Sequence, residues 1–127
     1  MSKTVVRTES APAPFQGAPY NQAIVANGLV FVSGQGPLDA SGKLVEGDIA
    51  AATRQTFDNL AAILESAGSS LDKVVKASVF LADLGEFAAM NEVYKERMPA
   101  PHPARTTIQA AALPGGITVE IDVIALA

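Results

Sequence analysis

Residues 104–127 read ARTTIQAAALPGGITVEIDVIALA, and this stretch decides the predicted fold. Residues 104–112 and 117–127 are rich in β-branched and apolar side chains, and the turn-forming sequence Leu113-Pro114-Gly115-Gly116 joins them, which predicts a hairpin. If Leu113 pairs with Gly116, alternate residues of the two strands share a polar face. That predicted face carries Arg105, Thr107, Gln109, Glu120, Asp122 and Ile124. The opposite face is almost entirely apolar, so we expect it to contact the core.

Two helical patterns precede this hairpin. Apolar residues recur at three- and four-residue steps from Ile49 to Ala67, with Asp48 suited to the N-cap and Gly68 to the position after the last turn. A second pattern covers residues 84–98, where Phe87, Met90 and Tyr94 are expected in the core, and it ends at the proline-rich residues 99–103. Between the helices, the β-branched residues 74–82 predict a buried strand.

The N-terminal third of the chain predicts further strands. Asn27-Gly28 is typical of a type I′ turn and joins strands at residues 21–26 and 29–33. Residues 3–8 alternate loosely and could add another strand. The order of these elements predicts a single α+β domain over residues 1–127, with two helices packed on one face of a mixed sheet.

The composition excludes several classes of function. The chain has 127 residues, no cysteine and a single histidine, His102, so disulfides and thiolate chemistry are excluded and no metal site is expected. The formal net charge of −4 has the wrong sign for a nucleic-acid partner. No run approaches the roughly 20 apolar residues that cross a bilayer, so we expect a soluble, cytoplasmic protein without a membrane partner. Charged residues make up only 17% of the chain, which favours association of subunits.

Arg105 is the most informative polar residue, because a guanidinium can grip a carboxylate or phosphate through two hydrogen bonds. Glu120 or Asp122 could act as a base or position water in a sheltered cleft. The predicted register places Arg105 and Glu120 about 13 Å apart between Cα atoms, where their side chains could enclose a small molecule. The alternatives are a salt bridge for Arg105 and an ordinary solvated strand face for the two acids. Ser33 has no evident histidine partner for a nucleophilic triad.

Eight short segments and one single residue, in this order along the chain, carry a resemblance to a known family. They are AP (11–12), PYNQ (19–22), VSGQGP (32–37), DL (83–84), Phe87, NEVY (91–94), PARTT (103–107), ALP (112–114) and VEI (119–121). On these motifs the sequence resembles the RidA/YjgF family of small imine-processing proteins along nearly its whole length.

The resemblance implies a chorismate-mutase-like fold and a homotrimer with clefts between neighbouring subunits. It also implies hydrolysis of reactive 2-enamino and 2-imino acids, such as 2-aminoacrylate and 2-iminobutanoate, to 2-oxo acids and ammonia, without a cofactor. By position, Arg105 is similar to the arginine that holds the substrate carboxylate, and Glu120 to the acid that positions water. The other implied ligand contacts are Tyr20, Ser33, Gly34, Asn91 and the backbone at Thr107.

The sequence departs from the family pattern at two places. Many relatives have a cysteine where Thr107 stands, but imine hydrolysis needs no thiol nucleophile. The link at residues 95–102 is shorter than in several relatives, which bears on substrate size. Two other functions stay open. One is a non-catalytic trimer that binds small carboxylates to regulate or protect partners, and the other is an endoribonuclease, which the negative net charge disfavours.

Overall fold

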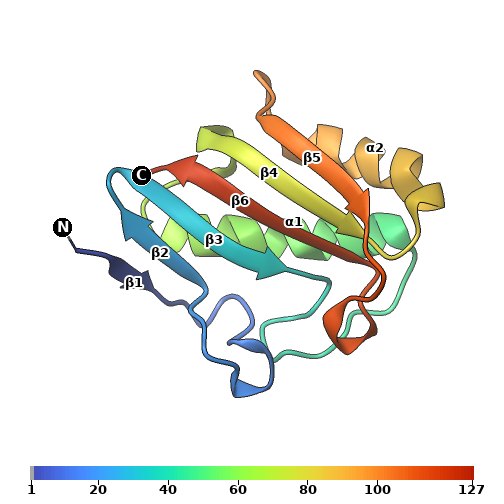
Figure 1. The fold of residues 1–127 in the computed structure, drawn as a ribbon, viewed down its shortest axis with the longest axis horizontal. Coiled ribbons are helices and arrows are strands. Elements are labelled where there is room, and N and C mark those ends of the chain that lie inside the picture. Colours follow the sequence, from blue (N-terminus) through green and yellow to red (C-terminus); the bar gives the residue numbers. More distant parts are fainter. Residues whose placement is uncertain (1) are drawn as a thin grey trace.

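Two helices cover one side of a six-stranded β-sheet in the computed structural model, which describes residues 2–127 (Figure 1). The helices are α1 (Ile49–Ser66) and α2 (Phe87–Arg97). The strands are β1 (Thr4–Val6), β2 (Ala23–Ala26), β3 (Leu29–Gln35), β4 (Val74–Leu81), β5 (Ala104–Gln109) and β6 (Val119–Leu126). Short 3₁₀ turns are η1 (Phe15–Gly17), η2 (Leu71–Lys73), η3 (Leu84–Glu86) and η4 (Pro114–Gly116). This arrangement confirms the predicted α+β class.

Both predicted helices are present, and their ends follow from side-chain chemistry. The Asp48 carboxylate accepts a hydrogen bond of 2.9 Å from the Ala51 N–H and so caps α1. Gly68, with φ of 80°, follows the last turn as predicted. The second helix begins at Phe87, three residues later than its predicted start at Leu84. Asp83 instead caps the preceding turn η3, where its carboxylate accepts from the Gly85 N–H at 2.8 Å.

The strand order is β1-β2-β3-β6-β4-β5. The β2–β3 hairpin is confirmed, with positive φ angles at Asn27 (52°) and Gly28 (77°). The predicted hairpin of residues 104–112 with 117–127 is wrong, because β4 lies between β5 and β6. It pairs with β5 in parallel and with β6 in antiparallel. Residues 110–118, which include η4, connect β5 to β6 and pass the end of β4. The strands β4 and β5 are parallel and are joined through α2, as in a crossover unit.

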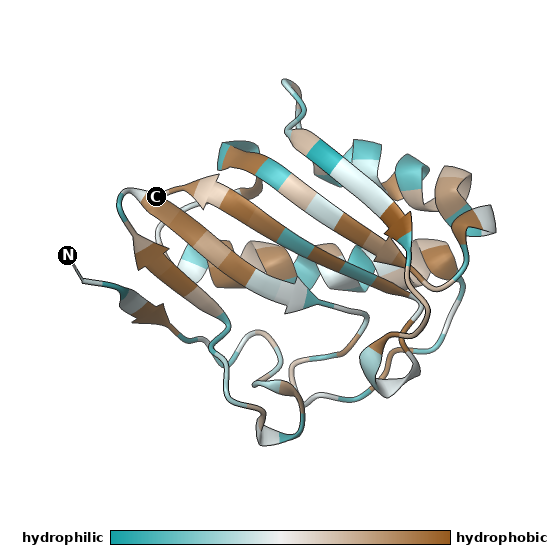
Figure 2. Cartoon of the chain, in the orientation of Figure 1, coloured by the Kyte–Doolittle hydropathy of each residue, from teal (hydrophilic) through white to brown (hydrophobic). Residues whose placement is uncertain are grey.

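The side chains of β4 and β6 alternate between the helices and the opposite, uncovered side of the sheet, and Figure 2 shows the corresponding alternation in hydropathy. The buried apolar core between sheet and helices includes Ala77, Val79, Leu81, Val119, Ile121 and Val123 from the strands, with Phe57, Leu60, Ile63, Leu64, Met90 and Val93 from the helices. The uncovered side, here called the open face, also exposes apolar side chains, among them Val5, Phe31 and Ile108. Within residues 2–127, no helix is long and apolar enough to span a membrane.

This strand order also corrects the predicted polar face. Arg105 stands beside Ala77 in the ladder, and Ala77 in turn stands beside Val123. Because Ala77 and Val123 face the helices, Arg105 does so too. Glu120 alternates with the buried Val119 and Ile121 and therefore projects from the open face. Arg105 and Glu120 of one chain thus lie on opposite faces of the sheet.

Candidate active site

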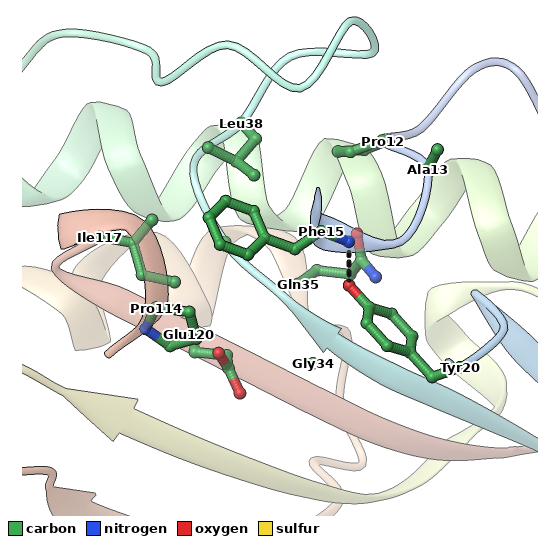
Figure 3. A pocket seen from close by; sticks show the side chains of 11 residues that line it. Pro12, Ala13, Phe15, Tyr20, Gly34, Gln35, Leu38, Pro114, Ile117 and Glu120 are labelled. Atoms are coloured by element: carbon green, nitrogen blue, oxygen red, sulfur yellow. Dashed lines mark hydrogen bonds between the residues drawn. The ribbon is translucent and has the colours of Figure 1, made fainter. Parts of the chain in front are cut away.

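Glu120 lines an open cavity of about 480 Å³ together with Tyr20, Ser33 and Gly34. Phe15, Ala18 and Pro114 complete its wall. A narrower recess of about 70 Å³ adjoins it, and its wall includes the apolar side chains of Pro12, Leu38 and Ile117 (Figure 3). We call Tyr20, Ser33, Gly34 and Glu120 the acid half-site. Four of the seven residues that the resemblance implies are therefore together.

A backbone irregularity makes room for the Glu120 carboxylate. The register between β3 and β6 shifts between Val32 and Gln35, so the segment with Ser33 and Gly34 bulges. A Cβ atom on Gly34 would lie 2.4 Å from Oε2 of Glu120, which only a residue without a side chain avoids. Burial raises the pKa of Glu120, and the negative charge of Asp122 on the same face raises it further. The carboxyl group is thereby tuned toward proton transfer nearer neutral pH.

The two hydroxyl groups of this half-site have different hydrogen-bonding capacities. The Phe15 N–H donates to Oη of Tyr20 at 2.6 Å, so the Tyr20 hydroxyl proton stays available for a ligand (Figure 3). The Ser33 hydroxyl donates to the Asn21 carbonyl at 2.6 Å, so its oxygen can only accept. Because that proton goes to a carbonyl and not to a base, Ser33 is not set up as a nucleophile.

Arg105 lines a different cavity, of about 350 Å³, together with Asn91 of α2. The other lining residues are Glu92, Tyr94, Lys95, His102 and Pro103. Oδ1 of Asn91 is buried and has no hydrogen-bond partner within residues 2–127. Thr107 lies two residues after Arg105 on β5 and so shares its face of the sheet. We call Asn91, Arg105 and Thr107 the arginine half-site.

No carboxylate among residues 2–127 forms a salt bridge with Arg105. In the part of the chain that the structure describes, the salt bridges are Arg54–Glu96 and Arg97–Asp58, and neither involves Arg105. A salt bridge within the chain, one of the alternatives drawn from the sequence, is therefore not formed by the described residues. A half-buried guanidinium without a counter-ion is suited to bind an anion.

Sequence reasoning missed three residues next to these groups. Phe15 holds the Tyr20 hydroxyl, and Phe87 and Tyr94 flank the Arg105 guanidinium. The expectation that Phe87 belongs to the core is wrong, because 40% of its surface is exposed. Tyr94 is buried as expected, yet it also lines the arginine cavity. The helical spacing of Phe87, Asn91 and Tyr94 was a usable signal, because residues i, i+4 and i+7 share one helix face.

No three His, Asp or Glu side chains among residues 2–127 gather closely enough to hold a metal ion. The groups available for chemistry are therefore a free guanidinium, a carboxyl group with a raised pKa, and a phenol that can donate a hydrogen bond. The guanidinium can bind a small carboxylate, and the carboxyl group and the phenol, in a separate cavity of the same chain, can transfer or donate protons.

Comparison with known proteins identifies the lineage. The 2-iminobutanoate/2-iminopropanoate deaminase of Capra hircus is 42% identical over 98% of this chain and 90% of its own length. Reactive Intermediate Deaminase A of Arabidopsis thaliana, a chloroplastic protein, is 45% identical over 98% of this chain and 66% of its own. The crystal structure of E. coli TdcF with bound serine matches with a TM-score of 0.90 and 34% identity, covering 98% of each chain. The family described as Endoribonuclease L-PSP matches residues 8–127. The chain therefore belongs to the L-PSP/RidA family.

Proposed function

We propose that this protein hydrolyses 2-enamino and 2-imino acids to 2-oxo acids and ammonia in clefts between the subunits of a homotrimer. The observation that carries this proposal is the division of the site. The chain holds an anion-binding half with Arg105 and a proton-transferring half with Glu120, on opposite faces of one sheet. Each half is incomplete, so a cleft that contains both needs two chains.

The open face supports assembly with a second copy. Phe31, with 41% of its surface exposed, and Ile108, with 47%, lie on this face, where no helix covers them. Covering them would remove apolar surface from water, which is the dominant favourable term in protein association. In a closed ring, each subunit can offer its arginine half-site to one neighbour and its acid half-site to the other.

The chemistry of the two halves fits a 2-imino acid. The guanidinium of Arg105 would bind the carboxylate through charge-assisted hydrogen bonds, each contributing roughly 1.5 to 3 kcal/mol in a sheltered site. The TdcF structure holds serine, which also carries a carboxylate next to a nitrogen-bearing carbon. The goat and Arabidopsis relatives are named for the deamination of such intermediates.

The reaction needs only water and proton transfers. An enamine first tautomerises to the imine, whose C=N carbon is electrophilic. Ionised Glu120 takes a proton from the attacking water as the oxygen bonds to the imine carbon, and the C=N electron pair moves to the nitrogen, which takes that proton back from Glu120. The Tyr20 hydroxyl, whose oxygen already accepts from the Phe15 N–H, can donate a hydrogen bond to the developing charge. Glu120 then removes the proton of the new hydroxyl group and passes it to the amino nitrogen, so that breaking the C–N bond releases ammonia, leaves the 2-oxo acid and returns Glu120 to its ionised form, with one water consumed.

The proposal is tested by coupling the purified protein to threonine dehydratase and following the loss of 2-iminobutanoate. We expect acceleration by the wild type. Arg105→Ala should reduce both acceleration and 2-oxobutanoate binding by at least about 100-fold, since it removes at least two charge-assisted hydrogen bonds. Glu120→Gln should abolish acceleration but retain binding. Wild-type binding of 2-oxobutanoate without any acceleration would contradict the proposal and select a carboxylate-binding module. Cleavage of RNA that survives in both variants would indicate a different activity.

A further inference from the structure

Two aromatic rings lie beside the guanidinium of Arg105, and no carboxylate among residues 2–127 forms a salt bridge with it. Its Cζ atom lies 4.6 Å from the centroid of the Tyr94 ring and 5.6 Å from that of Phe87. Both distances fall within the range of a cation–π interaction. Two aromatic residues from consecutive turns of α2 therefore contact the guanidinium of Arg105 on β5.

The position of Tyr94 is fixed by the core. Only 6% of its surface is exposed, and its ring packs edge-on against Phe57 with the centroids 5.6 Å apart. Phe57 of α1 is fully buried, so Tyr94 has little freedom to move. Burial raises the pKa of Tyr94, while the nearby charge of Arg105 and the approach of its side chain to the Tyr94 hydroxyl oppose that rise. The ring of Tyr94, held in place by the core, therefore contacts the guanidinium of Arg105 from a fixed position.

Arg97 shows the alternative way to hold an arginine on this helix. Its Cζ atom also lies near an aromatic ring, 5.8 Å from the centroid of Phe57, but its guanidinium is bound to Asp58 at 2.8 Å. Such a carboxylate neutralises the charge and occupies N–H donors. An aromatic face attracts the cation but leaves the donors, which lie in the plane of the guanidinium, free for another partner.

We propose that Tyr94 is a positioning residue whose ring holds the Arg105 guanidinium in the orientation that binds the ligand carboxylate. Phe87, at a longer distance, restricts the same group less strongly. This inference rests on the proposed function, because it takes the ligand to be a 2-imino or 2-oxo carboxylate. The Tyr94 hydroxyl also lies close to the Arg105 side chain, which acts to lower the pKa of Tyr94, but it makes no hydrogen bond of normal length and angle within residues 2–127, so we assign the role to the ring.

Three variants separate the ring from the hydroxyl: Tyr94→Phe, Tyr94→Leu and Phe87→Leu. The readouts are KM and kcat for the imine and the dissociation constants of 2-oxobutanoate and its neutral amide. We expect Tyr94→Phe to stay within about twofold of the wild type, because the ring remains. Tyr94→Leu should raise KM and weaken 2-oxobutanoate binding by about three- to thirty-fold, the range of a cation–π contact, and Phe87→Leu by less. Affinity for the neutral amide should not change, which a general loss of structure would not reproduce.

The outcomes keep this inference separate from the proposed function. Because Tyr94 is buried and its leucine variant risks misfolding, unchanged affinity for the neutral amide is the check that Tyr94→Leu is folded. The half-exposed Phe87→Leu variant tests the second, weaker aromatic contact with Arg105 at a site that the core does not need. An active wild type whose Tyr94→Leu and Phe87→Leu variants bind 2-oxobutanoate normally would overturn the inference alone. An equal loss in Tyr94→Phe and Tyr94→Leu would also overturn it, by assigning the effect to the hydroxyl. A wild type that neither binds 2-oxobutanoate nor accelerates imine loss would overturn both.

Discussion

Replacing Gly34 by alanine should displace the Glu120 carboxylate with little effect on the fold. The added Cβ would lie 2.4 Å from Oε2 and 2.8 Å from Cδ of Glu120, while ordinary contact begins at 3.4 Å, so the carboxylate must move by about 1 Å. A displacement of that size in a catalytic group costs roughly 100-fold in rate. Gly34 does not have a positive φ, so alanine adopts its backbone conformation, and we expect the free energy of unfolding to change by less than about 1 kcal/mol.

The assay is kcat for imine hydrolysis with threonine dehydratase as the source, together with urea unfolding of each variant. Gly36→Ala is the matched control, since the nearest atoms to its Cβ would be Cδ1 of Ile117 at 2.7 Å and the carbonyl oxygen of Val119 at 3.3 Å, and not the carboxylate of Glu120. We expect this control to lose stability and to retain most of kcat. A Gly34→Ala variant with wild-type kcat would refute the reasoning, because the position of the Glu120 carboxylate would then not matter.

Three further predictions concern the open face. Because the charge of Asp122 raises the pKa of Glu120, Asp122→Asn should lower that pKa and move the acid limb of the kcat/KM profile to lower pH. An acid limb that keeps its pH or moves to higher pH contradicts this prediction. A carboxyl group whose pKa is raised on folding destabilises the folded state as the pH rises through its unfolded-state pKa, and the loss is complete above the raised folded-state pKa. Glu120→Gln should therefore raise the Tm more at pH 8 than at pH 4, as calorimetry can show. Phe31→Asp should dissociate the assembly, seen by light scattering, and abolish hydrolysis without unfolding the chain, because Phe31 is 41% exposed in the single subunit. An active, monomeric variant would show that one chain is sufficient.

Local signals in the sequence predicted the individual elements well. The Asp48 cap, Gly68 after the helix and the Asn27-Gly28 turn all act through their immediate neighbours, so their effect can be read without the rest of the fold. Alternation within a strand was equally reliable, since Arg105 and Thr107 share one face and Glu120 and Asp122 share another. These features depend on spacing of a few residues.

The relation between strands could not be predicted from the same signals. The two glycines after Pro114 suggested a hairpin turn, but the pattern of strand 74–82, helix and strand 104–112 was also typical of a parallel crossover, and the structure follows that pattern. With β4 inserted, Arg105 lies beside Ala77 and Ala77 beside Val123, so the side chains of these residues point to the same face of the sheet. Glu120 is three residues before Val123 on β6, so its side chain points to the opposite face. Pairing partners depend on packing of the whole core, which a single turn signal does not report.

The surroundings of Arg105 were beyond sequence reasoning for a related reason. The helical spacing of an aromatic residue predicts that it packs in the core, and this pattern is the same whether or not a cation also contacts the ring. The sequence therefore predicted only a core position for Tyr94. Its second role depends on β5 lying beside α2, which follows from the parallel pairing with β4. The candidate residues themselves were identified by the resemblance, and the structure sorted them into two half-sites.

Mixing two inactive variants tests most directly whether the cleft is shared between chains. Arg105→Ala and Glu120→Gln subunits are unfolded together at equal concentration, refolded and assayed for imine hydrolysis. Random assembly gives about one quarter of the clefts an intact Arg105 from one subunit and an intact Glu120 from its neighbour, so about a quarter of wild-type activity should return. The double variant mixed with either single variant should remain inactive. Absence of recovery in the first mixture, with assembled and folded subunits, would contradict a site built from opposite faces of two neighbouring sheets.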